Sequence, residues 1–330
     1  MNIKQIILRK YAAPALVALG IHRIWLRKRS NDCVLMFHGV TADRNGSVRH
    51  MSTQEFRDLL ILLKKEFELV SLNDLHSTGN KFSKPRAAVT FDDGYMNNFI
   101  EAAPILEEMK IPATFFLISE SLNNNAFTLP IDVIDCIIKK YNPENISIDG
   151  LKFRRAGSTY LSEMNDDIYS YIIRNSHKMH SFSKELSEQF PFEFIKDPVC
   201  SKLVSFIDAA TLKRIAANPL FSFASHSATH INFTTASEDI VVSELRDSKR
   251  RIEELTGQVC SAIAYPYGLY NKFTRHATQD AGYSIAYSVK YQLEQDKSDP
   301  GIFQRIGISN TTTPQVNLLN ICKLNKDFGV

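Results

Sequence analysis

Short apolar runs alternate with amphipathic stretches along most of this 330-residue chain. The apolar runs have the length of buried strands, and the stretches between them repeat apolar residues at helical intervals, as at Phe56, Leu60 and Leu63. This alternation predicts an α/β fold with parallel strands and helical crossovers, and about eight strands favour a distorted (β/α) barrel. We expect strands at residues 33–37, 68–71, 87–91, 113–118, 220–224, 261–265, 283–287 and 303–308.

The alternation stops between about residue 119 and about residue 218. This part contains the polar run at residues 123–125 and helical patterns at residues 131–141, 166–175 and 209–217. The strand and helix pattern then resumes and continues toward the C-terminus. We interpret the interruption as a helical insertion within one domain that covers residues 31–330.

The first 30 residues differ from the rest of the chain in charge. They hold seven Lys or Arg side chains and no Asp or Glu, although the whole chain has a formal charge of only +3. The apolar run at residues 11–21 is about half of the roughly 20 residues that a membrane-spanning helix needs. We therefore expect residues 1–30 to form a basic amphipathic segment on an anionic membrane surface. The protein would then be cytoplasmic and peripheral to the inner face of the membrane. The alternatives are a helix packed on the protein's own body and an uncleaved N-terminal membrane anchor.

Charge and cysteine usage exclude several other classes. Residues 31–330 carry a small excess of acidic side chains, which argues against broad nucleic-acid binding. The five cysteines are widely spaced and never form a C-x-x-C pair, so neither a disulfide framework nor a cysteine zinc site is indicated, and a reducing compartment is favoured. The chain also lacks a G-x-S-x-G, a G-x-G-x-x-G and a P-loop motif.

Polar side chains gather where the expected strands end, which is where parallel α/β folds carry ligands and catalytic groups. Asp92 and Asp93 follow the third expected strand, and His226 and His230 follow the fifth. Imidazole and carboxylate groups both suit zinc, and two imidazoles four residues apart can converge on one ion if their loop coils. Taken one at a time, each pair is also typical of an ordinary turn or of structural histidines.

Two more strand ends carry polar groups. Tyr267 lies between Pro266 and Gly268, in a turn that can present its backbone N–H to a substrate oxygen. His38 follows the first expected strand. Each is by itself also typical of a structural role.

Together these segments resemble the motifs of the NodB-type polysaccharide deacetylases, carbohydrate esterase family 4. The resemblance runs from Val34 to about Ser309, apart from the insertion. It includes three flanking segments, namely Val-Ser-Leu-Asn-Asp-Leu at 70–75, Ala-Ala-Pro-Ile-Leu at 102–106 and Pro-Ala-Thr-Phe-Phe-Leu at 112–117. It implies that residues 31–330 are a deacetylase domain with the NodB-homology fold, a distorted barrel of seven or eight strands.

The resemblance also implies roles for the residues at the strand ends. Asp93, His226 and His230 would bind a divalent metal ion, with zinc favoured, and Asp92 would be the general base. Zinc with three such ligands keeps one open position, where bound water has a pKa of about 7. The metal and the Tyr267 N–H would stabilise the oxyanion.

The chain departs from the family pattern in two places. Family members commonly carry an arginine where this sequence has Ala264, and the C-terminal leucine-x-histidine motif is missing because no histidine follows His276. The resemblance is closest to the branch in which a histidine on the first strand serves as the acid. We therefore expect His38 to protonate the leaving amine and Arg305 to orient Asp92. The alternative for Arg305 is an ordinary surface ion pair.

These features predict a metal-dependent hydrolase that removes an N-acyl group from an amino sugar in a glycan or glycolipid. Acetyl is the favoured acyl group. The expected substrate is an N-acylated carbohydrate or a lipid-linked sugar. One alternative is a deacylase of a small amide or ester, and another is a glycan-binding or scaffolding protein on a degenerate deacetylase fold. The retention of Asp92 and of all three expected metal ligands argues against the degenerate protein, because drift would have altered these residues too.

Overall fold

The computed structural model describes residues 6–27, 32–42, 49–77, 83–124, 126–191, 196–198 and 200–323. The chain divides into two compact units. Unit 1 comprises Met1–Phe91, Asn98–Thr114 and Arg305–Val330, and unit 2 comprises Asp92–Asn97 and Phe115–Gln304. The division of the chain into a segment 1–30 and a domain 31–330 stays a prediction.

Parallel strands form the centre of unit 1. Strand β1 (Cys33–Phe37) pairs with β5 (Arg86–Phe91) on one side and with β14 (Ile306–Gly307) on the other, and β4 (Glu68–Leu69) also pairs with β5. Phe37, Phe56 and Phe91 contact one another with ring centroids 5.3 to 5.7 Å apart. The apolar runs of the sequence therefore form buried strands, as their composition predicts.

Unit 2 contains four further parallel strands of the same sheet. Strands β10 (Phe221–Ser225), β11 (Ala262–Ala264), β12 (Ile285–Ser288) and β13 (Ile302–Gln304) pair in parallel, each with the next. Strand β6 (Ala113–Leu117) has its first two residues in unit 1 and its last three in unit 2.

The strand order identifies the fold. It runs β13-β12-β11-β10-β6-β5-β1-β14, and the strands at its two ends, β13 and β14, are separated in the sequence only by Arg305. An order whose ends are joined by one residue is that of a nearly closed parallel barrel of eight strands. The predicted barrel is confirmed, except that the strand expected at 303–308 is divided at Arg305.

One helix of unit 1 begins at a capping motif that can be read from the sequence. Helix α4 (Thr53–Glu66) has a capping box between Ser52 and Glu55, as the spacing predicts, and an ion pair between Arg57 and Glu108 joins it to α6 (Ala103–Met109). Further elements of this unit are α5 (Leu72–His76), the π-helical turn η2 (Asn98–Ala102), α6 (Ala103–Met109), α14 (Pro314–Lys323) and the parallel pair of short strands β2 (Gly39–Thr41) and β3 (His50–Ser52).

The crossover helices of unit 2 also lie where the sequence predicts them. Helix α12 (Glu238–Thr256) ends at Gly257, which has the left-handed φ of 66° that favours glycine. Three further helical elements lie near the ends of the insertion, namely η3 (Glu120–Leu122), α10 (Ser201–Val204) and α11 (Ala209–Ile215), and three follow it, namely η5 (Pro266–Gly268), α13 (Lys272–Asp280) and η6 (Glu294–Lys297).

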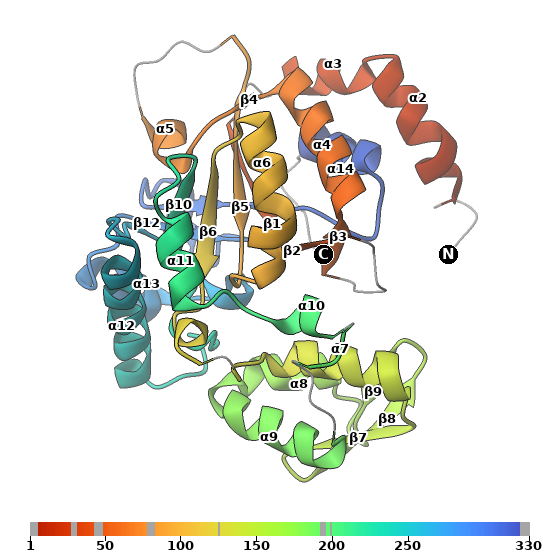
Figure 1. Ribbon diagram of the computed structural model, residues 1–330, viewed down its shortest axis with the longest axis vertical. Coiled ribbons are helices and arrows are strands. Elements are labelled where there is room, and N and C mark those ends of the chain that lie inside the picture. Colours follow the sequence, from red (N-terminus) through yellow and green to blue (C-terminus); the bar gives the residue numbers. More distant parts are fainter. Residues whose placement is uncertain are drawn as a thin grey trace. The chain divides into compact units, whose positions relative to one another are not determined.

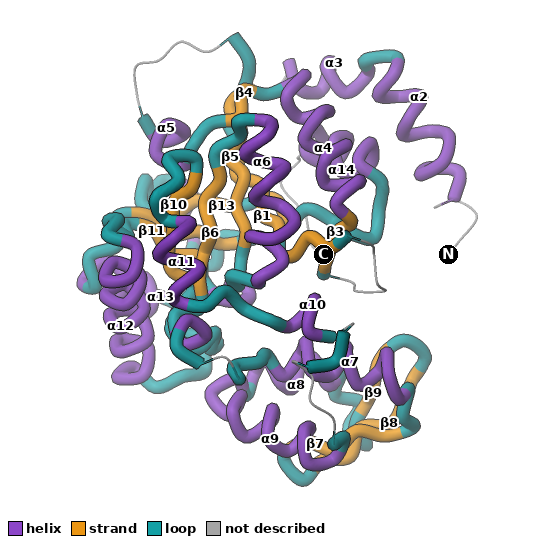
Figure 2. The backbone as a smooth tube through the Cα atoms, in the orientation of Figure 1, coloured by secondary structure: helices purple, strands orange, loops and turns teal. Residues whose placement is uncertain are grey.

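The insertion contains a small sheet that the sequence analysis did not predict. Strands β7 (Asn145–Ile148), β8 (Leu151–Ala156) and β9 (Thr159–Leu161) pair in antiparallel fashion beside helices of the same insertion (Figure 2). Asp149 and Gly150, both with positive φ, connect the first two strands, and such Asp-Gly pairs favour hairpins. The insertion is therefore not purely helical. The helical elements in its middle part are α7 (Pro130–Tyr141), α8 (Ile168–Arg174), η4 (Ser176–Lys178) and α9 (Met179–Gln189).

The described N-terminal residues form three short helical elements of unit 1. These are the π-helical η1 (Leu8–Ala12), α2 (Ala13–Ala18) and α3 (Ile21–Arg27), which lie against α14 (Figure 1). Their contact with α14 is apolar and is formed by Ala13, Leu16, Val17, Trp25, Val316 and Leu319. This inner face of the segment therefore packs on the protein's own body, and the membrane association of residues 1–30 stays a prediction. None of the helices in the described ranges is long and apolar enough to cross a membrane.

Candidate metal centre

The loop that follows β5 carries two buried carboxylates. Asp92 and Asp93 are 2% and 3% exposed, and Asp93 and Gly94 both have positive φ, at 71° and 82°. A Cβ on residue 94 would lie 2.8 Å from Leu117 Cδ2, so the turn needs glycine for space as well as for conformation. Tyr95 fixes the far side of this loop, because its hydroxyl donates a 2.8 Å hydrogen bond to the buried Asp132.

The loop that follows β10 carries the two histidines and is held by its own serines. The Ser227 N–H donates to Ser225 Oγ at 3.1 Å, and the His230 N–H donates to Ser227 Oγ at 2.8 Å. The His226 N–H donates to the carbonyl of Leu117 in β6 at 2.8 Å. These bonds coil the loop, as the sequence analysis required for the two imidazoles to converge.

Glu244 of α12 also holds this loop, and sequence reasoning missed it. Its carboxylate accepts hydrogen bonds from the N–H groups of Ala228 and Thr229, at 2.8 and 2.9 Å, and from the Thr229 hydroxyl at 2.6 Å. Burial raises the pKa of Glu244, although these hydrogen bonds oppose that rise. One charged residue on a helix with many surface charges gives no sequence signal for such a role.

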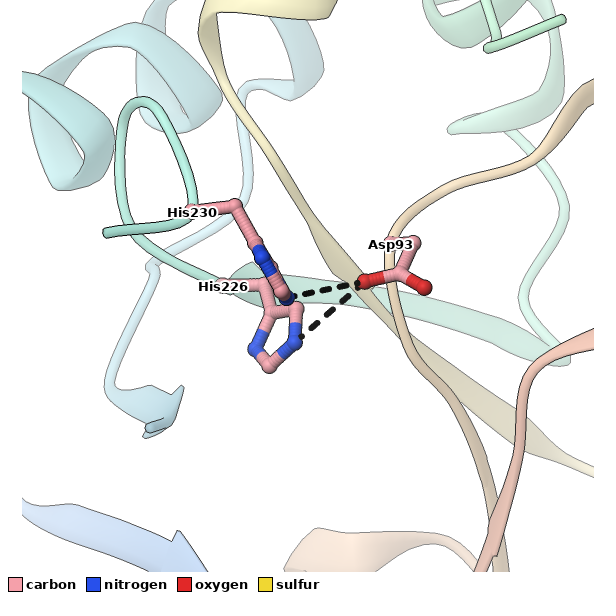
Figure 3. A group of neighbouring side chains, drawn as sticks. All are labelled: Asp93, His226 and His230. Carbon is pink, nitrogen blue, oxygen red and sulfur yellow. Dashed lines mark ion pairs between the residues drawn. The ribbon is translucent and has the colours of Figure 1, made fainter. Parts of the chain in front are cut away.

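The three expected ligands converge on one point (Figure 3). Asp93 Oδ1 lies 3.4 Å from His226 Nε2 and 3.3 Å from His230 Nε2, and the ligand atoms of the three residues all lie within 4.8 Å of one another. Ligands about 2.0–2.1 Å from a tetrahedral zinc ion are themselves about 3.3 Å apart. The donor set, and the spacing of Asp93 from each imidazole, therefore fit a divalent metal ion.

A hydrogen bond to His226 also favours metal binding. His226 Nδ1 lies 2.8 Å from the carbonyl oxygen of Ala264, which can only accept, so Nδ1 carries the proton and donates. Nε2 then has its lone pair directed toward Asp93. A ligating histidine is commonly oriented in this way, by donation of its other N–H to a carbonyl.

The backbone conformation supports a functional role for these loops. Four non-glycine residues at the site have left-handed φ, namely Asp93, Ser227, His230 and Tyr267, at 71°, 68°, 65° and 58°. They are half of the eight such residues among the described ranges. Backbone strain of this kind concentrates at functional sites, where the surrounding structure holds it in place.

Two further predicted residues lie at this centre. Asp92 Oδ2 is 3.8 Å from His226 Nε2, so its carboxylate lies beside the candidate metal ligands. The ring of Tyr267 packs edge-on against the ring of His230, with centroids 4.6 Å apart. Tyr267 belongs to the tight turn η5, where its φ is 58°.

His38 and Arg305 belong to unit 1, whereas the residues above belong to unit 2. His38 lies between β1 and β2 and is partly exposed. Arg305 is 4% exposed, and its Nη1 donates to Thr90 Oγ1 at 3.4 Å. The alternative of a surface ion pair at Arg305 is therefore wrong, because the side chain is buried.

Comparisons with known proteins point to one family. The model of a family described as polysaccharide deacetylase matches residues 79–286. The poly-β-1,6-N-acetyl-D-glucosamine N-deacetylase of Staphylococcus aureus strain MRSA252 is 23% identical over 304 residues, which cover 91% of this chain and 81% of that protein.

Two solved structures share the fold. The deacetylase PplD of Streptococcus pyogenes, in complex with acetate, aligns with a TM-score of 0.55 and 17% identity over 88% of this chain and 96% of that one. IcaB of Ammonifex degensii aligns with a TM-score of 0.56 and 16% identity over 89% of this chain and 97% of that one. At these identities the structural likeness confirms the barrel fold.

Proposed function

The chain belongs to the polysaccharide deacetylase family, and we propose that it is a metal-dependent hydrolase that removes an N-acetyl group from an amino sugar in a glycan or glycolipid. The observation that carries this proposal is the convergence of Asp93, His226 and His230 beside Asp92. The S. aureus relative, named for deacetylation of an N-acetylglucosamine polymer, supports the substrate class.

The residues of unit 2 have separate tasks in this reaction. Asp93, His226 and His230 would hold a divalent ion, which when bound would supply Lewis-acid chemistry to the water and to the acetamide carbonyl. Asp92 takes the proton of the attacking water as the new carbon–oxygen bond forms. The Tyr267 N–H donates to the oxygen that becomes negatively charged.

The second half of the reaction needs an acid. As the carbon–nitrogen bond breaks, the amine of the sugar must gain a proton, and acetate is released. We assign this proton to His38 and the orientation of Asp92 to Arg305, in place of the family arginine and histidine that this chain lacks. The burial of Arg305 supports a role inside the protein rather than at its surface.

Release of acetate tests the function directly. The full chain is assayed on N-acetylated oligosaccharides and on lipid-linked N-acetylated sugars, as prepared, after chelation and after zinc is restored. We expect release of acetate that chelation abolishes and zinc restores. Saturable glycan binding without release of acetate would instead support a binding protein.

A matched pair of histidine variants tests the metal site. His230→Ala removes a proposed ligand, whereas His180→Ala removes an exposed histidine of α9 in the same unit. Elemental analysis after zinc reconstitution is expected to give one equivalent for wild type and His180→Ala, and less than about half an equivalent for His230→Ala. Equal metal content in the two variants would refute the site.

A further inference from the structure

The N-terminal helical segment, residues 6–27, is apolar on its outer face as well as on the face that packs against α14. Leu8, Tyr11, Ala15 and Leu19 follow one another at intervals of three or four residues, so they share one side of the helical path. All four are exposed, Tyr11 at 68% and Leu19 at 75%. Ile24 of α3 is exposed at 57%.

The inner face already explains how the segment is attached to unit 1. Ala13, Leu16 and Val17 pack on α14, and Arg23 and His22 bind the buried carboxylate of Glu66, with Arg23 Nη2 at 2.8 Å and His22 Nε2 at 3.2 Å. A helix that only covered its own protein would have a polar outer face. The outer apolar residues therefore need a second apolar phase to cover them.

The charges of the segment indicate whether a lipid bilayer or a second copy of the chain covers these apolar residues. Residues 1–30 contain seven Lys or Arg and no Asp or Glu, and the described cations Arg9 and Lys10 lie among the exposed apolar side chains. Arg23 also lines a pocket of about 270 Å³ with Lys65 and Lys84, where Glu66 is the one acidic residue. A second copy of the chain would oppose cations with identical cations in a symmetric contact, whereas anionic lipid headgroups complement them.

We propose that the outer face of residues 6–27 is a docking surface for an anionic lipid bilayer. Leu8, Tyr11, Leu19 and Ile24 enter the interface between headgroups and acyl chains, and the basic side chains contact the headgroups. The inner face keeps its contact with α14. The docking is independent of the reaction at the metal centre, and it would bring the enzyme to lipid-linked sugars.

Vesicle flotation of the full chain tests this surface. The probes are vesicles of phosphatidylcholine alone and vesicles with about one third phosphatidylglycerol, each at low and at high salt. Wild type is expected to float with the anionic vesicles at low salt and to be released at high salt, because screening shortens the reach of exposed charges. No binding, or equal binding to both vesicle types that resists high salt, would overturn the proposal.

A matched pair of triple variants assigns the binding to this face. Tyr11→Ser/Leu19→Ser/Ile24→Ser is compared with Met164→Ser/Ile240→Ser/Val259→Ser, which alters three exposed apolar side chains elsewhere. The first is expected to lose more than about tenfold in vesicle affinity with an unchanged melting temperature, and the second to bind like wild type. Equal binding by both variants would overturn the proposal. A dimer in solution that only the first variant abolishes would assign the face to a second copy instead.

Discussion

Two regions of this protein carry a pair of histidines at a strand end, and their surroundings differ in charge. After β10, His226 and His230 lie 3.4 and 3.3 Å from one carboxylate oxygen of Asp93. In the other region His38 follows β1 and His50 begins β3, and the charge of Arg49 acts on His50. A carboxylate favours a cation between imidazoles, and an arginine opposes one. The first pair is therefore suited to a metal ion, and the second is not.

The second pair is also shaped to keep one imidazole neutral. Burial first of all, together with the charges of Arg49 and His38, lowers the pKa of His50 to about 3. A Cβ on residue 39 would lie 2.4 Å from His50 Nδ1, so Gly39 lets the imidazole lie directly against the backbone. His50 is therefore neutral at physiological pH. The acid role of His38 stays a proposal that its own variant tests.

The largest expected effect is on turnover and concerns Asp92, which lies beside the first pair of histidines. Asp92→Asn should retain its metal ion and lose about 10²- to 10⁴-fold in turnover, because an amide cannot accept the proton of water. Metal content by elemental analysis and the rate of acetate release measure the two properties. Asp93→Asn serves as the contrast, since it should lose the metal as well. Retention of more than about a tenth of the turnover by Asp92→Asn would exclude a general-base role.

His38 tests whether the second pair takes part in the reaction. His38→Ala should lower turnover by at least about 10²-fold and keep full metal content, because the leaving amine loses its proton donor. His276→Ala, which removes an exposed histidine of α13, should match wild type. Loss of metal in His38→Ala would make it a ligand, and an unchanged turnover would remove it from the mechanism.

Variants of Glu244 test how far metal binding by His226 and His230 depends on the loop that carries them. Glu244→Ala should weaken zinc affinity about 10- to 100-fold, because Ala228 and Thr229 lose the acceptor that holds the loop. Glu244→Gln, which keeps one acceptor oxygen, should recover part of the affinity. Competition with a zinc chelator measures it, and Glu238→Ala at the exposed start of the same helix is the control. A fall in melting temperature without any change in affinity would make Glu244 merely structural.

The smallest expected effect is on the pH dependence of stability and concerns His50, the neutral histidine of the second pair. The folded-state pKa of His50, about 3, lies below the ordinary value of 6.5, so the unfolded chain gains a proton first as the pH falls. Its contribution to stability is present above about pH 6.5 and is lost progressively toward pH 3. The urea midpoint of His50→Gln should therefore fall less than that of wild type between pH 6.5 and 4.5. Parallel curves for the two proteins would contradict a buried neutral His50.

The sequence predicts the barrel and the metal ligands for a common reason. Parallel strands end at the same edge of a sheet, so Asp93 and His226 could be expected to meet even though they are far apart in the chain. The coiling of the loop by Ser225 and Ser227 could not be predicted, because it depends on side-chain hydrogen bonds that have no spacing pattern.

Other features were missed for different reasons. Glu244 acts through the fold, since only the packing of α12 beside β10 brings its carboxylate to the histidine loop. Arg305 lies between β13 and β14, and its burial could not be predicted because a long cationic side chain is ordinarily exposed. The sheet of the insertion did have a signal, because Asp149 and Gly150 stand between apolar alternations at Ile146, Ile148 and Phe153.

The pairing of β1 with β14 has a consequence for biosynthesis. Leu35 pairs with Ile306, so the first strand of the barrel gains its second neighbour only when the last strand has been made. At a synthesis rate of 5–20 residues per second, the edge of β1 stays unpaired on this side for on the order of 10 to 60 s. An open strand edge can pair with other chains, and long-range closure of this kind is slow. The nascent protein therefore passes through a stage that is prone to aggregation, and folding chaperones would act during that interval.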